Sequence, residues 1–119
     1  MATNIKQLLN QVLSSPEIVN LLPNKRVYFL HAEAPEKPYL EYEIIDEFGE
    51  AWAENREIAT NYYIQVDIFS MGDYTAIENA VKDTMISYGF KRSMSVDLYE
   101  NDIKLYHKVM RFVITLKNK

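Results

Sequence analysis

Cysteine is absent from this 119-residue chain, and glycine occurs only three times. Without cysteine there can be neither a disulfide nor a thiolate metal site, which suits a protein of a reducing cytosol. Gly49, Gly72 and Gly89 are too widely separated to form a glycine-rich loop around a phosphate group. The chain therefore lacks common sequence signals for redox, metal and nucleotide chemistry.

Long apolar runs are missing as well. No segment approaches the roughly 20 apolar residues that a membrane-spanning helix needs. The opening MATNIKQLLNQVL has no basic region ahead of an apolar core, as a secretion signal would have. We therefore expect a protein that is made in the cytoplasm and has no membrane partner. Its length and its 48% hydrophobic residues predict a single domain over residues 1–119.

Charge is distributed unevenly along the chain, although the net charge is only −4. Nine acidic and two basic residues lie between Glu33 and Glu57, whereas seven basic and three acidic residues follow Phe90. One end of such a chain can pair with the opposite end of a neighbouring copy. The alternative is that both regions are simply solvated surfaces. The overall acidity argues against tight nucleic-acid binding, which needs a concentrated basic patch.

Helices are predicted in two parts of the chain. Asn4 can cap a first helix whose apolar residues recur at three- and four-residue steps. Ser15 and Pro16 predict the cap and first residue of a second short helix. A longer helix is expected over Tyr74–Tyr88, with Asp73 as its cap and Gly89 in a left-handed C-terminal position.

Strands are predicted from alternation of apolar and polar residues and from β-forming residue types. They cover Arg26–His31, Tyr39–Asp46, Ile58–Ser70 and Phe90–Tyr99, and a last strand carries Met110, Phe112, Ile114 and Leu116 on one side. Phe48–Glu50 is expected to turn the chain, so that residues 50–57 form a tip. Glu100–Asp102 is expected to be the last turn.

The resulting order, α-β-β-β-α-β-β, predicts the α+β class. Its simplest packing is a single, mainly antiparallel, twisted sheet with helices on one face. The buried face should combine apolar residues of three strands and the long helix: Leu40, Tyr42, Ile44, Ile64, Val66, Ile68, Phe112, Ile114, Ile77, Val81 and Met85.

Catalytic and metal-binding patterns are weak. His31 and His107 could join Glu33 or Glu36 at a metal, but no HxH or HExxH spacing is present, and isolated strand histidines are usually polar surface residues. Glu41 and Glu43 share one strand face and could act as acid and base, but that face is expected to be wet. No serine has a GxSxG setting. We therefore expect no enzyme activity, no bound metal and no cofactor.

Aromatic residues point towards protein binding instead. Tyrosine occurs nine times, Tyr63 has the outward phase of Gln65 and Asp67, and Trp52 lies in an acidic tip. Tyr and Trp are enriched where proteins meet, although they could equally cover the outer face of a sheet. The candidate interface residues combine these aromatics with the charged groups: Trp52, Glu50, Glu54, Glu57, Tyr63, Lys91, Arg92, Lys108 and Arg111.

Three segments carry a resemblance to a known family. A helical start precedes KRVYFLHAEAPEKPYLEYEI, in which a proline-containing loop separates two strands. YYIQVDIFSMGDYTAIENAVKDTMISYGF then follows, and aromatic-containing strands come after a charged turn. In order and spacing, these segments resemble the tail-completion (tail-terminator, head–tail joining) proteins of long-tailed phages and prophages.

The resemblance implies a structural virion protein made in the bacterial host cytoplasm. Such a protein would form a ring, commonly a hexamer, that ends growth of the tail tube and provides a docking surface for the head connector. Its partners would be itself, the tail-tube protein and the head connector protein. The alternative is an intracellular protein-binding module that uses an aromatic sheet face, without catalysis.

Overall fold

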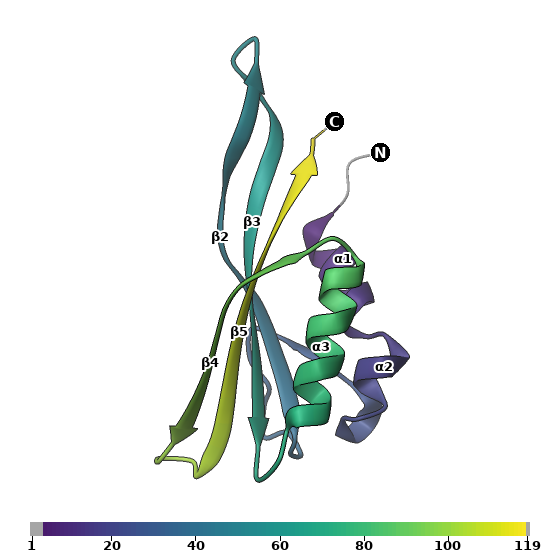
Figure 1. Cartoon of the computed structure of the whole chain (residues 1–119), viewed down its shortest axis with the longest axis vertical. Coiled ribbons are helices and arrows are strands. Elements are labelled where there is room, and N and C mark those ends of the chain that lie inside the picture. Colours follow the sequence, from purple (N-terminus) through teal and green to yellow (C-terminus); the bar gives the residue numbers. More distant parts are fainter. Residues whose placement is uncertain (1–3, 119) are drawn as a thin grey trace.

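The computed structural model of the chain describes residues 4–118 (Figure 1). It begins with helices α1 (Ile5–Leu13) and α2 (Pro16–Val19) and a short 3-10 helix, η1 (Pro23–Lys25). The remaining elements are β1 (Tyr28–Phe29), β2 (Tyr39–Ala53), β3 (Arg56–Ser70), α3 (Thr75–Ser87), β4 (Lys91–Glu100) and β5 (Leu105–Lys117). The order predicted from the sequence is confirmed.

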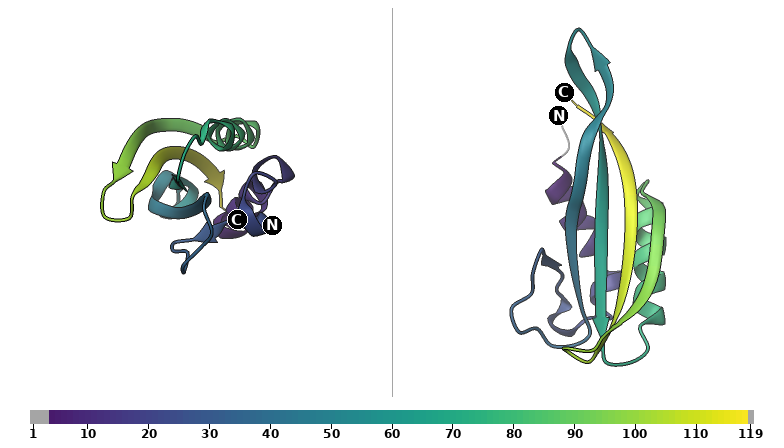
Figure 2. Two further views of the ribbon diagram at one scale, coloured as in Figure 1. Left: turned by 90° about the horizontal axis from the view of Figure 1, so that it is seen from below. Right: turned by 90° about the vertical axis from the view of Figure 1, so that its left-hand side faces the viewer.

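The strands of this range form one sheet in the order β1-β2-β3-β5-β4. β1 runs parallel to β2, and every other pair of neighbours is antiparallel. α1, α2 and α3 lie on the same side of the twisted sheet (Figures 1 and 2). The predicted α+β class, with a single mainly antiparallel sheet and helices on one face, is therefore confirmed. We call the helix-covered side the inner face and the opposite side the open face.

The inner face holds the core that the alternation predicts. Ile64, Val66 and Ile68 are fully buried and pair with the inward residues of β2 and β5. The set that packs around them includes Leu40, Tyr42, Phe112 and Ile114 from the sheet and Ile77, Val81 and Met85 from α3, with Ile44 half-buried at its margin. Gln65 and Asp67 lie on the open face, so the predicted phase of β3 is correct.

Local sequence signals explain most helix ends. The Asn4 side chain accepts hydrogen bonds from the backbone N–H groups of Lys6 and Gln7, as an N-cap does. Asp73 accepts the N–H of Thr75 at the start of α3, and Gly89 ends that helix with a φ of 97°. Ser15 differs from expectation, because its hydroxyl donates to the carbonyl of Val12 rather than capping α2.

Strand lengths also differ from expectation. β1 is confined to Tyr28–Phe29, because the chain leaves β2 at Leu30, which has a φ of 69°. The turn expected at Phe48–Glu50 is wrong: β2 continues to Ala53, and register shifts between Ile44 and Asp46 and between Gly49 and Ala51 absorb extra residues. Such bulges keep two strands paired while bending them. The turn itself lies at Glu54 and Asn55.

The molecule is elongated, with principal extents of 51, 27 and 25 Å. Its length comes from the end of the β2–β3 hairpin, which projects past the helices at the top of Figure 1. The pairing of β3 with β5 reaches only to Ala59, so the hairpin is two-stranded beyond this point. We call this projecting part, residues 51–58, the arm.

Candidate functional site

Trp52 lies on the arm, where its indole packs against its own strand. A Cβ atom at Gly49 would come within 2.7 Å of Trp52 Cζ2, so only glycine allows this contact without displacement. Trp52 as a whole residue nevertheless remains 62% exposed. Both alternatives for this residue, folding back on the sheet and remaining available to a partner, are thus compatible with its geometry.

The acidic candidates near the arm fall into two groups. Glu50 accepts a hydrogen bond from Asn61 Nδ2 at 2.8 Å, and Glu57 accepts one from the Thr60 hydroxyl. The Glu50 contact joins β2 to β3, whereas the Glu57 contact lies within β3, where Glu57 also accepts a hydrogen bond from Asn118 Nδ2 at 3.3 Å. Glu54 instead lies exposed in the turn, with a φ of 53°. Glu50 therefore helps to hold the hairpin, and Glu57 connects it to the residue that follows β5.

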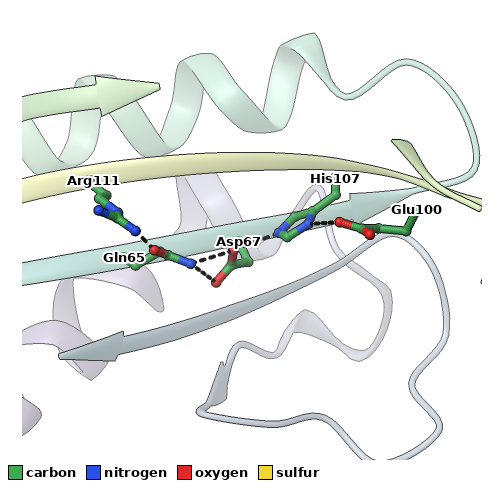
Figure 3. Close-up of polar contacts among 5 residues, drawn as sticks. All are labelled: Gln65, Asp67, Glu100, His107 and Arg111. Carbon is green, nitrogen blue, oxygen red and sulfur yellow. Dashed lines mark hydrogen bonds and ion pairs between the residues drawn. The ribbon is translucent and has the colours of Figure 1, made fainter. Parts of the chain in front are cut away.

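Three basic candidates lie on the neighbouring strands β4 and β5. Lys91 and Arg92 are the exposed first residues of β4, and Arg111 is paired in register with Met94 close by. Arg111 Nε donates to Gln65 Oε1 at 3.0 Å on the open face (Figure 3). The register places Lys91 opposite Val113 and Arg92 opposite the inward-facing Phe112, so Arg92 and Arg111 are on different faces of the sheet.

Lys108, the fourth basic candidate, is buried, so the surface position expected for an interface residue is wrong. It has the inward phase of Met110 and is only 6% exposed. Its Nζ lies 3.2 Å from Asp97 and 3.3 Å from Glu78, so it joins β5 to β4 and α3. A buried lysine needs such partners, because an unpaired charge is costly to desolvate.

Tyr63 lies on the open face, as its phase predicts. It is half-buried and stacks on Phe48, with the ring centroids 5.6 Å apart. A second row of rings crosses the same face: Tyr39 stacks on Phe69, and Phe69 stacks on His107 at 4.2 Å. The aromatic residues of this face therefore cover one another in part, as expected if the tyrosines serve to cover the outer face of the sheet.

His107 is the centre of a polar network that the sequence did not predict (Figure 3). Its Nε2 lies 2.7 Å from Asp67 Oδ1, and its Nδ1 lies 2.7 Å from Glu100 Oε2. Each contact is within hydrogen-bond distance, so the imidazole bridges the two carboxylates through its two nitrogens. Gln65 adds donors to Asp67 at 3.0 and 3.3 Å and connects the network to Arg111.

This network corrects the expectation that His107 is an ordinary surface residue and that its sheet face is wet. Asp67 is only 5% exposed, and Glu41 is sheltered by the loop after β1, where the N–H of Ala32 donates to its carboxylate at 2.9 Å. No signal within the sequence could reveal the cluster, because Asp67 and His107 meet only through the register of β3 and β5.

The cluster connects three strands, because Asp67, His107 and Glu100 belong to β3, β5 and β4. The two carboxylates occupy opposite nitrogens of the same imidazole, which leaves neither nitrogen open to a metal or a substrate. Within residues 4–118 no group of three or more His, Asp or Glu side chains is arranged to hold a metal ion. The exposed ring of His31 instead lies 3.2 Å from Glu33 and 3.7 Å from Glu41.

A cavity of about 490 Å³ lies at the start of α3, lined in part by Asp73, Tyr74, Glu78, Asp97 and Tyr106. The hydrogen bond that the Tyr74 hydroxyl donates to Asp97 raises the pKa of Tyr74 to about 12. The same hydrogen bond, helped by Lys108, holds the pKa of Asp97 below its usual range. The three acids of this lining already have partners: Asp73 bonds to Thr75, Glu78 to Lys108 and Asp97 to Tyr74.

None of the described helices is long and apolar enough to cross a membrane. No protein-family model matches this sequence, and no curated protein is significantly similar to it.

Proposed function

We propose that this chain is a structural subunit of a phage virion, which completes the tail tube and joins it to the head connector as a ring of identical copies. The observation that carries the proposal is the arm. A two-stranded hairpin that projects from the core and exposes the only tryptophan is well suited to contact a neighbouring subunit.

The separation of charge supports a ring rather than a two-fold dimer. A cyclic assembly uses two different patches on each subunit, so an acidic patch can meet a basic one on the next copy. The exposed acids Asp46, Glu47 and Glu54 lie along the hairpin, whereas Lys91 and Arg92 start the strand at the opposite edge of the sheet. The two patches are therefore on different sides of the molecule.

The same proposal includes the place of action and the partners. The protein would be made in the bacterial host cytoplasm and end in the virion, in contact with the tail-tube protein and the head connector. A hexamer is the expected ring size. Acidic side chains that remain exposed in a channel would repel DNA during its passage, which agrees with the absence of a concentrated basic patch in the sequence.

A second candidate is an intracellular protein-binding module without catalysis. It is favoured by an exposed apolar row on the open face, which consists of Met94, Val96 and Leu98 in β4. Such a module would act as a monomer that binds a different protein. Self-association therefore separates the two candidates.

The test is native mass spectrometry of the purified protein over a range of concentrations, combined with negative-stain microscopy of the concentrated sample in low salt. We expect closed annuli of uniform size and a mass that is an integral multiple of 14.0 kDa. A protein that remains monomeric at every concentration and shows no annuli would contradict the ring and favour the binding module.

A further inference from the structure

We infer that β4 of one copy pairs in antiparallel orientation with β2 of the next copy, so that one sheet continues through the assembly. The side of β4 that faces away from β5 would meet the free edge of β2 from Glu43 to Ala53, beyond the part that β1 covers. The inference deepens the proposed function and rests on it, because it requires self-association. It names the surfaces that meet and the chemistry by which they recognise each other: backbone hydrogen bonds, supported by opposite charge.

The first surface is β4, which is an edge strand in the described sheet. It pairs with β5 on one side, and no strand among residues 4–118 pairs with its other side. Nine of its ten residues are exposed, and only Glu100 is half-buried. β4 contains no proline, which natural proteins often use to protect an edge from pairing, and its register shift is confined to its first residues, between Arg92 and Met94. Its unpaired backbone groups are thus available as a template for another strand.

The second surface is the part of β2 that lies beyond β1. β1 covers Glu41 and Tyr42, and the last backbone bond on this side joins the N–H of Leu30 to the carbonyl of Tyr42 at 2.9 Å. From Glu43 to Ala53, no described strand lies along this edge. A cavity of about 460 Å³ opens where β1 stops, with Phe29, Leu30 and Ile45 among its lining residues. Apolar side chains therefore accompany this free edge as well.

The strand directions fit a ring. β2 and β5 run one way along the sheet, and β3 and β4 run the other way. If the copies are related by rotation about an axis to which the strands are inclined, as in a barrel, each copy keeps the same strand sense, and β4 meets the next β2 antiparallel. The inclination is required, because β4 lies level with residues 39–46 of its own β2 and must be offset to reach the free stretch of the next copy. Antiparallel pairing is the slightly more stable arrangement per residue.

Charge complementarity identifies a second copy as the occupant of these edges. The free stretch of β2 and its turn carry the exposed acids Asp46, Glu47 and Glu54, and β4 begins with the exposed bases Lys91 and Arg92. The two acids of β4 are already engaged, Asp97 with Lys108 and Glu100 with His107. The bases are therefore the charges that β4 offers to an incoming acidic strand.

Cysteine cross-linking tests the contact, and the natural absence of cysteine makes every cross-link attributable. Ser95→Cys in β4 is combined with a cysteine in β2, placed in turn at Ile45, Glu47 and Ala51 to sample register. We expect at least one doubly substituted chain to give a ladder beyond the dimer on a non-reducing gel. Mixing the two matching single variants should give a dimer of unlike chains only.

Two controls make the result specific. Asn79→Cys, on the exposed surface of α3, combined with Glu47→Cys should give no ladder. Native mass measurements on the unsubstituted chain report assembly independently of any cross-link, and circular dichroism confirms that each variant is folded.

Three outcomes would overturn the inference. If Ser95→Cys alone cross-links to a dimer, β4 pairs with itself about a two-fold axis. If the unsubstituted chain assembles but no doubly substituted chain gives a ladder, the copies meet through other surfaces, and the proposed function still stands. If the unsubstituted chain does not assemble at all, the inference and the proposed ring fall together.

Discussion

At the scale of single residues, His107 shows how a polar group is accommodated on a sheet. Its ring joins β3, through Asp67, to Glu100 at the end of β4, and stacks on Phe69. Asp67 is nearly buried, so its carboxylate depends on the donors that face it. A buried acceptor that loses its partner costs about 1–3 kcal/mol, and more if it is charged.

We therefore expect His107→Gln to lower the free energy of unfolding by about 1–3 kcal/mol, since glutamine cannot donate to both carboxylates with the geometry of the ring. Urea denaturation measures this effect. A double-mutant cycle with Asp67→Asn isolates the pair, because the two losses should be clearly less than additive. Additive losses would show that His107 contributes through stacking rather than through Asp67.

Tyr74 and Asp97 provide a prediction for pH. Their hydrogen bond raises the pKa of Tyr74 from 10.0 to about 12 and lowers the pKa of Asp97 below 3.8. The bond requires a protonated phenol and an ionised carboxylate. Its contribution to stability is therefore fully present between pH 3.8 and pH 10.0, the ordinary pKa values of the two groups. The contribution is lost as pH rises through the raised pKa of Tyr74 and as pH falls through the lowered pKa of Asp97.

The measurement is the difference in unfolding free energy between the natural chain and Tyr74→Phe, taken by urea denaturation from acid to alkaline pH. We expect a plateau across neutral pH and a decline towards both extremes. Tyr99→Phe is the matched control, because Tyr99 is exposed and contacts the ring of Tyr106. A difference that does not change with pH would contradict the assignment.

At the scale of elements, β3 is the strand on which the core depends. Ile64 and Ile68 are fully buried between β2, β5 and the helices. Truncation of either residue to alanine should destabilise the protein by about 2–5 kcal/mol, since a large buried side chain leaves both lost burial and a cavity. Val113→Ala, at a half-buried position on the open face of β5, is the control and should cost much less. Equal losses at Val113 and Ile64 would contradict the face assignment.

Much of this architecture could be predicted from local pattern. The alternation of β3 identified its buried phase, and Asn4, Asp73 and Gly89 marked helix ends. The extent of β2 could not be predicted, because Gly49 resembles a turn residue and its actual role, to admit the indole of Trp52, depends on a contact within the folded hairpin.

The candidate site was predicted less completely, for a related reason. The surface positions predicted for three candidates, Lys91, Arg92 and Trp52, agree with the structure, in which all three residues are exposed. Lys108 and His107 depend on what lies across the sheet, at Glu78, Asp97 and Asp67. Register and the placement of α3 decide these contacts, and neither follows from a single strand.

At the scale of the whole molecule, opposite charge should govern assembly. Reversal of Glu50, Glu54 and Glu57, the acidic candidates from the sequence, would also remove the hydrogen bond that joins Glu50 to Asn61 across the hairpin and the contacts of Glu57 with Thr60 and Asn118. Asp46→Lys, Glu47→Lys and Glu54→Lys together avoid this, since these residues are exposed. We expect the triple variant to keep its circular dichroism spectrum and to lose self-association.

Sedimentation velocity measures this loss, and salt should weaken assembly of the natural chain in the same way, because charges are screened over about 10 Å at 0.1 M ionic strength. Addition of a chain with Lys91→Glu and Arg92→Glu should restore association with the triple variant. Natural-sized rings from the triple variant alone would remove the electrostatic part of the proposal.

The position of Trp52 also has a consequence for optical measurements. It is the only tryptophan, and it lies on the arm against Gly49 rather than among the core side chains. Emission excited at wavelengths selective for indole therefore reports the local environment of the hairpin tip. Loss of this signal during denaturation would follow detachment of the ring from Gly49, while the tyrosine absorbance of the sheet follows the remainder of the chain. A blue shift of the tryptophan emission in the absence of denaturant would indicate that another protein surface covers the indole at the tip.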